Sequence, residues 1–103
     1  MIQKTEIRKY ARRIAQTFRP KRVLLFGSYA SGSATEDSDV DLLVIMNHDK
    51  PRNVDQAIDI QLKIAAPFPL DLLVRRPKDI TRRLSMNDTF MRTVIEDGQV
   101  LYG

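Results

Sequence analysis

Segments in which apolar residues recur with a helical period alternate along this chain with short apolar runs that are typical of strands. Near the N-terminus they return every three or four residues, which predicts an amphipathic helix from about Gln3 to Phe18 that ends at Pro20. Two apolar runs follow, from Arg22 to Phe26 and from Val40 to Met46, and both are predicted to be buried strands. The small, polar segment from Ser28 to Ala34 indicates one helical turn followed by a loop.

The second half of the chain continues this alternation. Pro51 suits the first turn of a helix, and the stripe expected to face the core consists of Val54, Ala57, Ile58, Leu62 and Ala65. After Pro67, the run from Leu70 to Val74 predicts a third strand. Pro77 then opens a helical region that the polar residues 85–88 divide in two, with Asn87 or Asp88 as a cap. Gly98 suits the end of the last helix, and residues 100–102 are expected to form a short edge strand.

This order of elements predicts an α+β fold in which a small mixed β-sheet is flanked by helices. With 103 residues, no repeat and no linker, residues 1–103 are expected to form a single domain. The 43% hydrophobic and 29% charged residues agree with a folded globular protein. Because no apolar run approaches the roughly 20 residues of a membrane span, we expect a cytoplasmic protein without membrane contact.

Composition also excludes several chemistries. The chain has no cysteine, which rules out disulfides, thiolate zinc sites and thiol nucleophiles. Its one histidine, His48, lies in a polar stretch and is predicted to be a loop residue. Eight of the 17 basic residues fall within the first 22 positions. The aromatic residues of this segment, Tyr10 and Phe18, belong to the apolar face of the predicted helix and not to its charged face. A solvated helix face is therefore favoured over a nucleic-acid surface, and no direct nucleic-acid substrate is expected.

Candidate chemistry concentrates at the ends of the predicted strands. Asp39 and Asp41 open the second strand, so their side chains should lie about 7 Å apart on one face. At an effective dielectric of about 20 they would repel by roughly 2–3 kcal/mol, which favours a cation between them. Asp71 is a third candidate, because an ionised aspartate inside an apolar strand needs a partner or a metal. Such a set of carboxylates suits Mg²⁺, which prefers oxygen ligands and usually retains substrate phosphates.

A Gly27-Ser28 pair directly follows the first strand. Such a pair permits a tight turn and a close approach of the backbone to a phosphate group, although a pair of this kind is also common in ordinary turns. Together with three carboxylates, it would provide the parts of metal-assisted phosphoryl transfer.

The combination of Gly27-Ser28, ten intervening residues, Asp39-Val40-Asp41 and a later Asp71 resembles the signature of the polymerase-β-like nucleotidyltransferase superfamily. The short chain is similar to its minimal members, the small antitoxin nucleotidyltransferases (MNT) that pair with HEPN-domain toxins. The resemblance implies the polymerase-β-like nucleotidyltransferase fold, a catalytic and Mg²⁺-binding triad of Asp39, Asp41 and Asp71, and nucleotide phosphates held by Gly27 and Ser28.

The same resemblance implies transfer of AMP from ATP onto a hydroxyl group, typically that of a tyrosine, of a partner HEPN toxin, with which the chain would form a hetero-oligomer. One position departs from the pattern, because Ser31 stands where the family often has an arginine; Arg75 and Arg76 are the candidates to supply that charge. The alternative is an antitoxin with a weak or inactive site that neutralises its partner by binding alone. A free-standing transferase for a small molecule is disfavoured, since such an enzyme would need a further substrate-binding domain.

Overall fold

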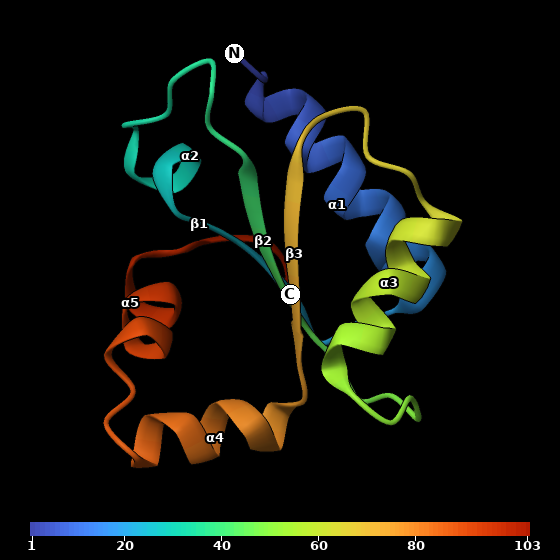
Figure 1. Ribbon diagram of the computed structural model, residues 1–103, viewed down its shortest axis with the longest axis vertical. Coiled ribbons are helices and arrows are strands. Elements are labelled where there is room, and N and C mark those ends of the chain that lie inside the picture. Colours follow the sequence, from blue (N-terminus) through green and yellow to red (C-terminus); the bar gives the residue numbers. More distant parts are fainter.

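The computed structural model describes all residues from Met1 to Gly103 and consists of one four-stranded sheet with helices on both faces (Figure 1). The sheet has the order β3-β2-β1-β4, in which β2 and β3 are parallel and the other neighbours are antiparallel. The elements in chain order are α1 (Lys4–Phe18), β1 (Arg22–Phe26), α2 (Ser28–Ser31), β2 (Val40–Ile45), α3 (Asn53–Lys63), β3 (Leu70–Arg75), α4 (Pro77–Ser85), α5 (Thr89–Asp97) and β4 (Gln99–Tyr102). The predicted mixed sheet flanked by helices is therefore confirmed.

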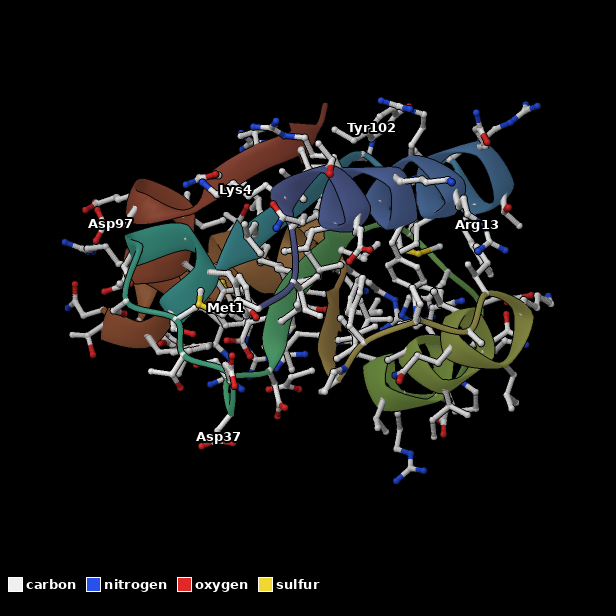
Figure 2. All side chains as sticks on the ribbon, turned by 90° about the horizontal axis from the view of Figure 1, so that it is seen from above. Met1, Lys4, Arg13, Asp37, Asp97 and Tyr102 are labelled. Carbon is white, nitrogen blue, oxygen red and sulfur yellow. The ribbon has the colours of Figure 1, made fainter.

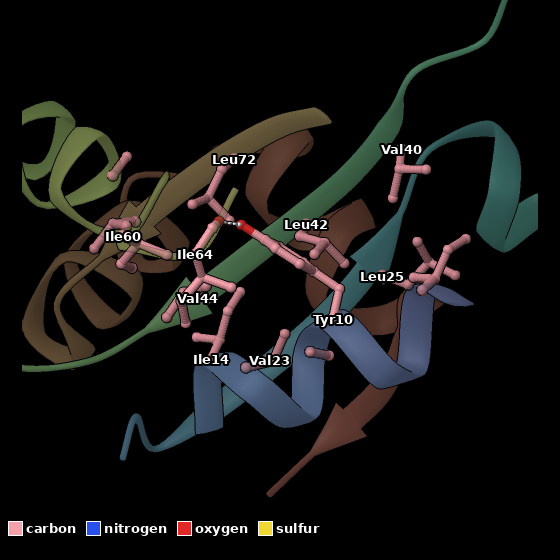
Figure 3. Packing of buried hydrophobic residues seen from close by; sticks show 14 of the residues in the cluster. Tyr10, Ile14, Val23, Leu25, Val40, Leu42, Val44, Ile60, Ile64 and Leu72 are labelled. Atoms are coloured by element: carbon pink, nitrogen blue, oxygen red, sulfur yellow. Dashed lines mark hydrogen bonds between the residues drawn. The ribbon is translucent and has the colours of Figure 1, made fainter. Parts of the chain in front are cut away.

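Helices α1 and α3 cover one face of the sheet, whereas α4 and α5 cover the other (Figure 1). The α1 face buries the larger cluster of apolar side chains, in which Tyr10 is central (Figure 3). The Tyr10 hydroxyl donates a 2.7 Å hydrogen bond to the Ile64 carbonyl, and its ring meets Phe68 edge-on with centroids 5.6 Å apart. The second cluster packs Leu24, Phe26, Leu43 and Ile45 of the sheet against Ile80, Met91 and Val94.

A polar side chain caps the start of α5, as the sequence indicates. The Asp88 carboxylate accepts a 2.9 Å hydrogen bond from the Met91 backbone N–H, so Asp88 caps α5. Asn87 instead adopts a positive φ of 58° in the link between α4 and α5. Of the two predicted caps, the structure selects Asp88.

Helix α3 differs from the prediction in its start and in its buried face. It begins at Asn53 rather than at Pro51, because Arg52 is extended and its N–H donates to the Asp55 carboxylate at 3.1 Å. Ala57 of the predicted stripe is buried, but the other core contacts come from Ile60 and Ile64. Val54, Ile58 and Leu62 are 52%, 50% and 80% exposed. The helix carries two apolar faces, and the sheet covers only one of them.

Candidate active site

The three predicted aspartates lie at the end of the sheet where β1 ends and where β2 and β3 begin. Asp41 pairs with Asp71 across the parallel β2 and β3 strands, and on its other side it pairs with Phe26 of β1. Side chains alternate along a strand, so Asp41 and Asp71 share the α5 face of the sheet with Leu43 and Phe26. Asp39 precedes β2 by one residue and is exposed, as is Asp71, whereas Asp41 is half-buried.

The electrostatics of this row of carboxylates is unfavourable without a cation. Burial raises the pKa of the Asp41 carboxyl above its usual value, and the nearby charges of Asp71 and Asp39 raise that pKa further. The ion pairs of the structure are Arg52–Asp55, Lys63–Asp59 and Arg83–Asp88, so no basic side chain neutralises the three aspartates. A positive charge supplied from outside the chain would relieve this repulsion.

The three carboxylates suit Mg²⁺ in their chemistry, and the strand pairing places two of them side by side. Carboxylate oxygens are its preferred protein ligands, and Asp41 and Asp71 sit on adjacent strands, which lie about 4.8 Å apart. As placed, however, the aspartates do not form a closed cluster of three or more metal-ligating side chains. Asp39 is exposed and lies just outside the strand.

Gly27 forms the turn that brings the backbone against these carboxylates. Its φ of 70° and ψ of −152° belong to a region that only glycine adopts readily. A Cβ atom at this position would lie 2.2 Å from the Asp41 Oδ2 atom, so any side chain would collide with the carboxylate. The Gly27 carbonyl accepts hydrogen bonds from the N–H groups of Ala30 and Ser31, both at 3.1 Å, and Ser28 begins α2. The predicted turn after the first strand is therefore present, directly beside Asp41.

A mostly apolar cleft of about 320 Å³ lies between α2 and α5, next to this turn. Its floor includes Phe26 and Gly27, and Phe90 forms part of its wall. The rings of Phe26 and Phe90 meet edge-on with centroids 5.8 Å apart, and Phe90 remains 52% exposed. Asp97, labelled in Figure 2, also lines the cleft. The sequence does not indicate this cleft, because Phe90 continues the helical spacing of Met91, Val94 and Ile95 and is not distinguished from core residues.

The arginines expected to compensate for Ser31 lie elsewhere, and this expectation is wrong. Arg75 is four residues beyond Asp71 on one strand, about 13 Å along the sheet, and it lines a separate groove with Arg82 and Arg83. The Arg76 guanidinium donates to the Lys50 carbonyl at 2.9 Å and to the His48 carbonyl at 3.3 Å. Arg75 is far from Asp71 because both lie on one extended strand, and it is far from Asp41 because the parallel pairing sets Arg75 level with Ile45.

Two other residues have structural roles. Tyr29 of α2 is buried in the α1-side core, and its hydroxyl accepts a 3.2 Å hydrogen bond from the Ile2 backbone N–H. Tyr29 therefore packs in the core rather than stacking on a nucleotide base. His48 lies in the loop before α3 and makes a 2.8 Å hydrogen bond with Asn53 Oδ1, as expected for a loop residue.

Comparison with known proteins defines the class. The family model described as "Nucleotidyltransferase domain" matches residues 5–101, nearly the whole chain. The chain therefore belongs to the nucleotidyltransferase domain family, and the row of aspartates beside the Gly27 turn lies within the matched region. It is a nucleotidyltransferase with an α+β fold consistent with the polymerase-β-like superfamily.

Individual relatives narrow the comparison. The chain is 34% identical over 84 residues to a protein of Methanocaldococcus jannaschii named "Putative protein adenylyltransferase". The matched region covers 82% of this chain and 80% of that protein. A second protein of the same name and organism is 27% identical over 91 residues, covering 88% and 86% of the two chains. A crystal structure titled as that of a "putative nucleotidyltransferase" from Sulfolobus solfataricus superposes with a TM-score of 0.63 at 21% identity, covering 93% of this chain and 76% of that one. This likeness concerns the fold alone.

No helix of the structure combines the length and the apolar character that crossing a membrane requires.

Proposed function

We propose that this nucleotidyltransferase transfers AMP from ATP onto a hydroxyl group, such as that of a tyrosine, of a partner protein, and that it does so with Mg²⁺. We further propose that the partner is a HEPN-domain toxin and that the modification silences it, so that the chain acts as its antitoxin. The names of the Methanocaldococcus jannaschii relatives support protein adenylylation as the reaction class.

The observation that carries the proposal is the row formed by Phe26, Asp41 and Asp71 across three strands, with Gly27 against Asp41. The raised pKa of Asp41 and the absence of a basic neighbour leave the row in need of a cation. A fold keeps such an arrangement at a cost in stability, which is typical of a functional site.

The three aspartates and the Gly27-Ser28 turn each have a role in the proposed reaction. Asp39, Asp41 and Asp71 would hold Mg²⁺, which when bound supplies charge neutralisation for the triphosphate. The Gly27-Ser28 turn would hold the phosphates, because Gly27 leaves no side chain between the backbone and Asp41. Asp71, which is exposed, would accept the proton of the attacking hydroxyl. The new bond joins that oxygen to the α-phosphorus, the bond to the bridging oxygen breaks, and pyrophosphate leaves.

The surface of α3 supports a protein partner. Val54, Ile58 and Leu62 are spaced four residues apart and are half or more exposed, so they form a continuous apolar stripe on the outer side of the helix. Exposed apolar patches of this kind are typical of protein interfaces. We propose that the toxin covers this stripe in a hetero-oligomer.

The alternative function is neutralisation by binding alone. It is favoured by two observations, namely that the aspartates do not form a closed metal cluster as placed and that Ser31 is no cationic clamp. Under this alternative the α3 stripe would remain essential, whereas the carboxylates would be dispensable.

Intact-mass spectrometry of the partner separates the two functions. The chain is co-expressed with the product of a neighbouring gene that encodes an all-helical protein with an Arg-x4-6-His motif, and the purified pair is incubated with ATP and Mg²⁺. We expect the partner to gain the mass of one or more AMP groups. The Asp39→Ala, Asp41→Ala double variant should form the complex but give no mass gain.

Asp49→Asn is the matched control, because Asp49 is an exposed carboxylate in the loop before α3, away from the row of aspartates. This variant should modify the partner as the wild type does. A stable complex whose partner mass never changes, with toxicity still suppressed by the double variant, would establish the binding-only alternative.

A further inference from the structure

The outer side of α1 and the strand end beside it carry an unusually dense positive charge. Eight basic residues occupy the first 22 positions against one acid, Glu6, and all but Arg22 are exposed. None of them takes part in an ion pair, since the three ion pairs of the structure involve α3, α4 and the link to α5. These residues are Lys4, Arg8, Lys9, Arg12, Arg13, Arg19, Lys21 and Arg22. Their charge is uncompensated within the chain.

Part of this charge forms a surface together with β4. Lys4, Arg8 and Arg12 repeat every four residues and so follow one side of α1, and Arg19 lies just beyond its end. We call these four residues the basic face. Lys4 also donates to the Gln99 side chain of β4 at 3.1 Å, which orients its ammonium group but leaves its charge uncompensated.

The tertiary structure places an aromatic ring within the basic face. Tyr102 of β4 lines a surface groove of about 450 Å³ with Arg12, Arg19 and Gln16. Tyr102 pairs with Val23 of β1 and is 41% exposed, so a large part of its side chain is accessible to a ligand. Figure 2 shows Lys4 and Tyr102 on the side of the molecule that α1 and β4 form. The sequence suggests a solvated face, because the aromatic residues of this segment, Tyr10 and Phe18, pack toward the core, but the fold brings another aromatic residue from the opposite end of the chain.

The chemistry of this surface points to a polyanion rather than to a protein. Protein interfaces are built around an apolar centre in which charged residues are depleted. Here the groove is lined by two arginines, a glutamine, an alanine and a single aromatic ring. Cations that follow a backbone and an aromatic ring that stacks on a base are the two features by which proteins bind single-stranded nucleic acid.

We infer that the basic face and Tyr102 bind single-stranded nucleic acid, with the cations along the phosphates and the Tyr102 ring stacked on an unpaired base. The surface lies on the α1 side of the sheet, opposite the face that carries Asp41. The inference is therefore independent of the proposed transfer reaction, and the nucleic acid is a ligand and not a substrate.

Fluorescence anisotropy with a fluorescein-labelled oligouridine of about 12 nucleotides tests this inference, and an oligothymidine of equal length distinguishes RNA from DNA. Four neutralised phosphates predict a slope of log K against log salt of about −3, or roughly a 50-fold loss of affinity between 50 and 200 mM salt. Excess ATP should not displace the oligonucleotide beyond its contribution to ionic strength.

Variants distinguish the contribution of the Tyr102 ring to binding from that of the positive charges. Arg12→Glu with Arg19→Glu should weaken binding by at least about tenfold, whereas Lys78→Glu with Arg92→Glu changes the net charge equally on α4 and α5 and should cost less than about threefold. Tyr102→Ala should weaken binding by about tenfold, and Tyr102→Phe should keep it within about twofold. Circular dichroism checks that each variant is folded.

Three results would overturn the inference. The first is that neither oligonucleotide binds at 50 mM salt, where four phosphate contacts should give measurable affinity. The second is equal binding by Tyr102→Ala and the wild type, which would leave the ring without a role. The third is binding of polyglutamate as tight as that of the oligonucleotides, which would identify an acidic protein as the occupant.

Discussion

Removing the charge of Asp41 should stabilise the protein while abolishing its reaction. Asp41 and Asp71 are register partners on strands about 4.8 Å apart, and two unit charges at that distance repel by about 3 kcal/mol at an effective dielectric of 20. Asp71 is exposed and Asp41 is half-buried, so solvent screens much of this energy. We therefore expect Asp41→Asn to raise the free energy of unfolding at pH 7, without divalent ions, by about 1 kcal/mol.

The sign of the pH dependence follows from the raised pKa of Asp41. A carboxyl whose pKa is higher in the folded state binds its proton more tightly there, so stability falls as the pH rises from the ordinary aspartate range through the folded pKa. The stabilisation by Asp41→Asn should thus be absent below about pH 4 and fully present above the folded pKa.

Thermal unfolding measures this effect, with an expected increase in Tm of about 4–8 °C at pH 7. Asp49→Asn, which removes an exposed carboxylate elsewhere, should leave Tm nearly unchanged. Adding Mg²⁺ at ten times its Kd should stabilise the wild type by about 1.4 kcal/mol and the variant much less. A variant that is less stable than the wild type at pH 7 would refute the reasoning, because it would mean that the Asp41 charge is already compensated in the fold.

Three further predictions concern the turn, a helix cap and the α3 stripe. Gly27→Ala should lower the free energy of unfolding by about 1–3 kcal/mol and abolish transfer, because its Cβ would meet the Asp41 carboxylate; denaturant titration and partner mass measure the two effects. Asp88→Ala should destabilise by about 1 kcal/mol in calorimetry through loss of the hydrogen bond to the Met91 N–H, and an unchanged Tm would contradict this role. Leu62→Asp should change stability by less than about 0.5 kcal/mol, since the side chain is 80% exposed, yet weaken the complex with the proposed partner in a binding titration. Unaltered affinity would exclude the stripe as the interface.

Much of the fold could be predicted from local patterns. The strand runs and the prolines and glycines between them locate all nine elements to within about two residues, as the close agreement at α1, β1, β2 and β3 shows. The turn at Gly27 was predictable for the same reason, because a glycine after a buried strand has a direct conformational meaning. Element boundaries and tight turns depend on residues that are close together in the sequence, so they can be predicted from it.

Features that depend on which surfaces meet could not be predicted in this way. Helix α3 has two apolar faces of similar size, and only the packing of Ile60 and Ile64 against the sheet decides which is buried. Likewise, the position of Arg75 relative to Asp41 follows from the direction of β3, because the parallel pairing sets Arg75 level with Ile45 at the other end of β2. The cleft beside Phe90 arises because α5 packs on β1, a contact between distant segments.

Local sequence is enough to identify the chemistry available to this protein: three aspartates and a glycine turn at strand ends, and no thiol or second histidine. Which of these groups act together depends on how the strands pair. The tertiary structure pairs Asp41 with Asp71 through the parallel register of β2 and β3, and it carries Tyr102 to the arginines of α1 through the pairing of β4 with β1. The physical reason is that local conformation follows from neighbouring residues, whereas proximity across a sheet follows from the burial of whole apolar faces.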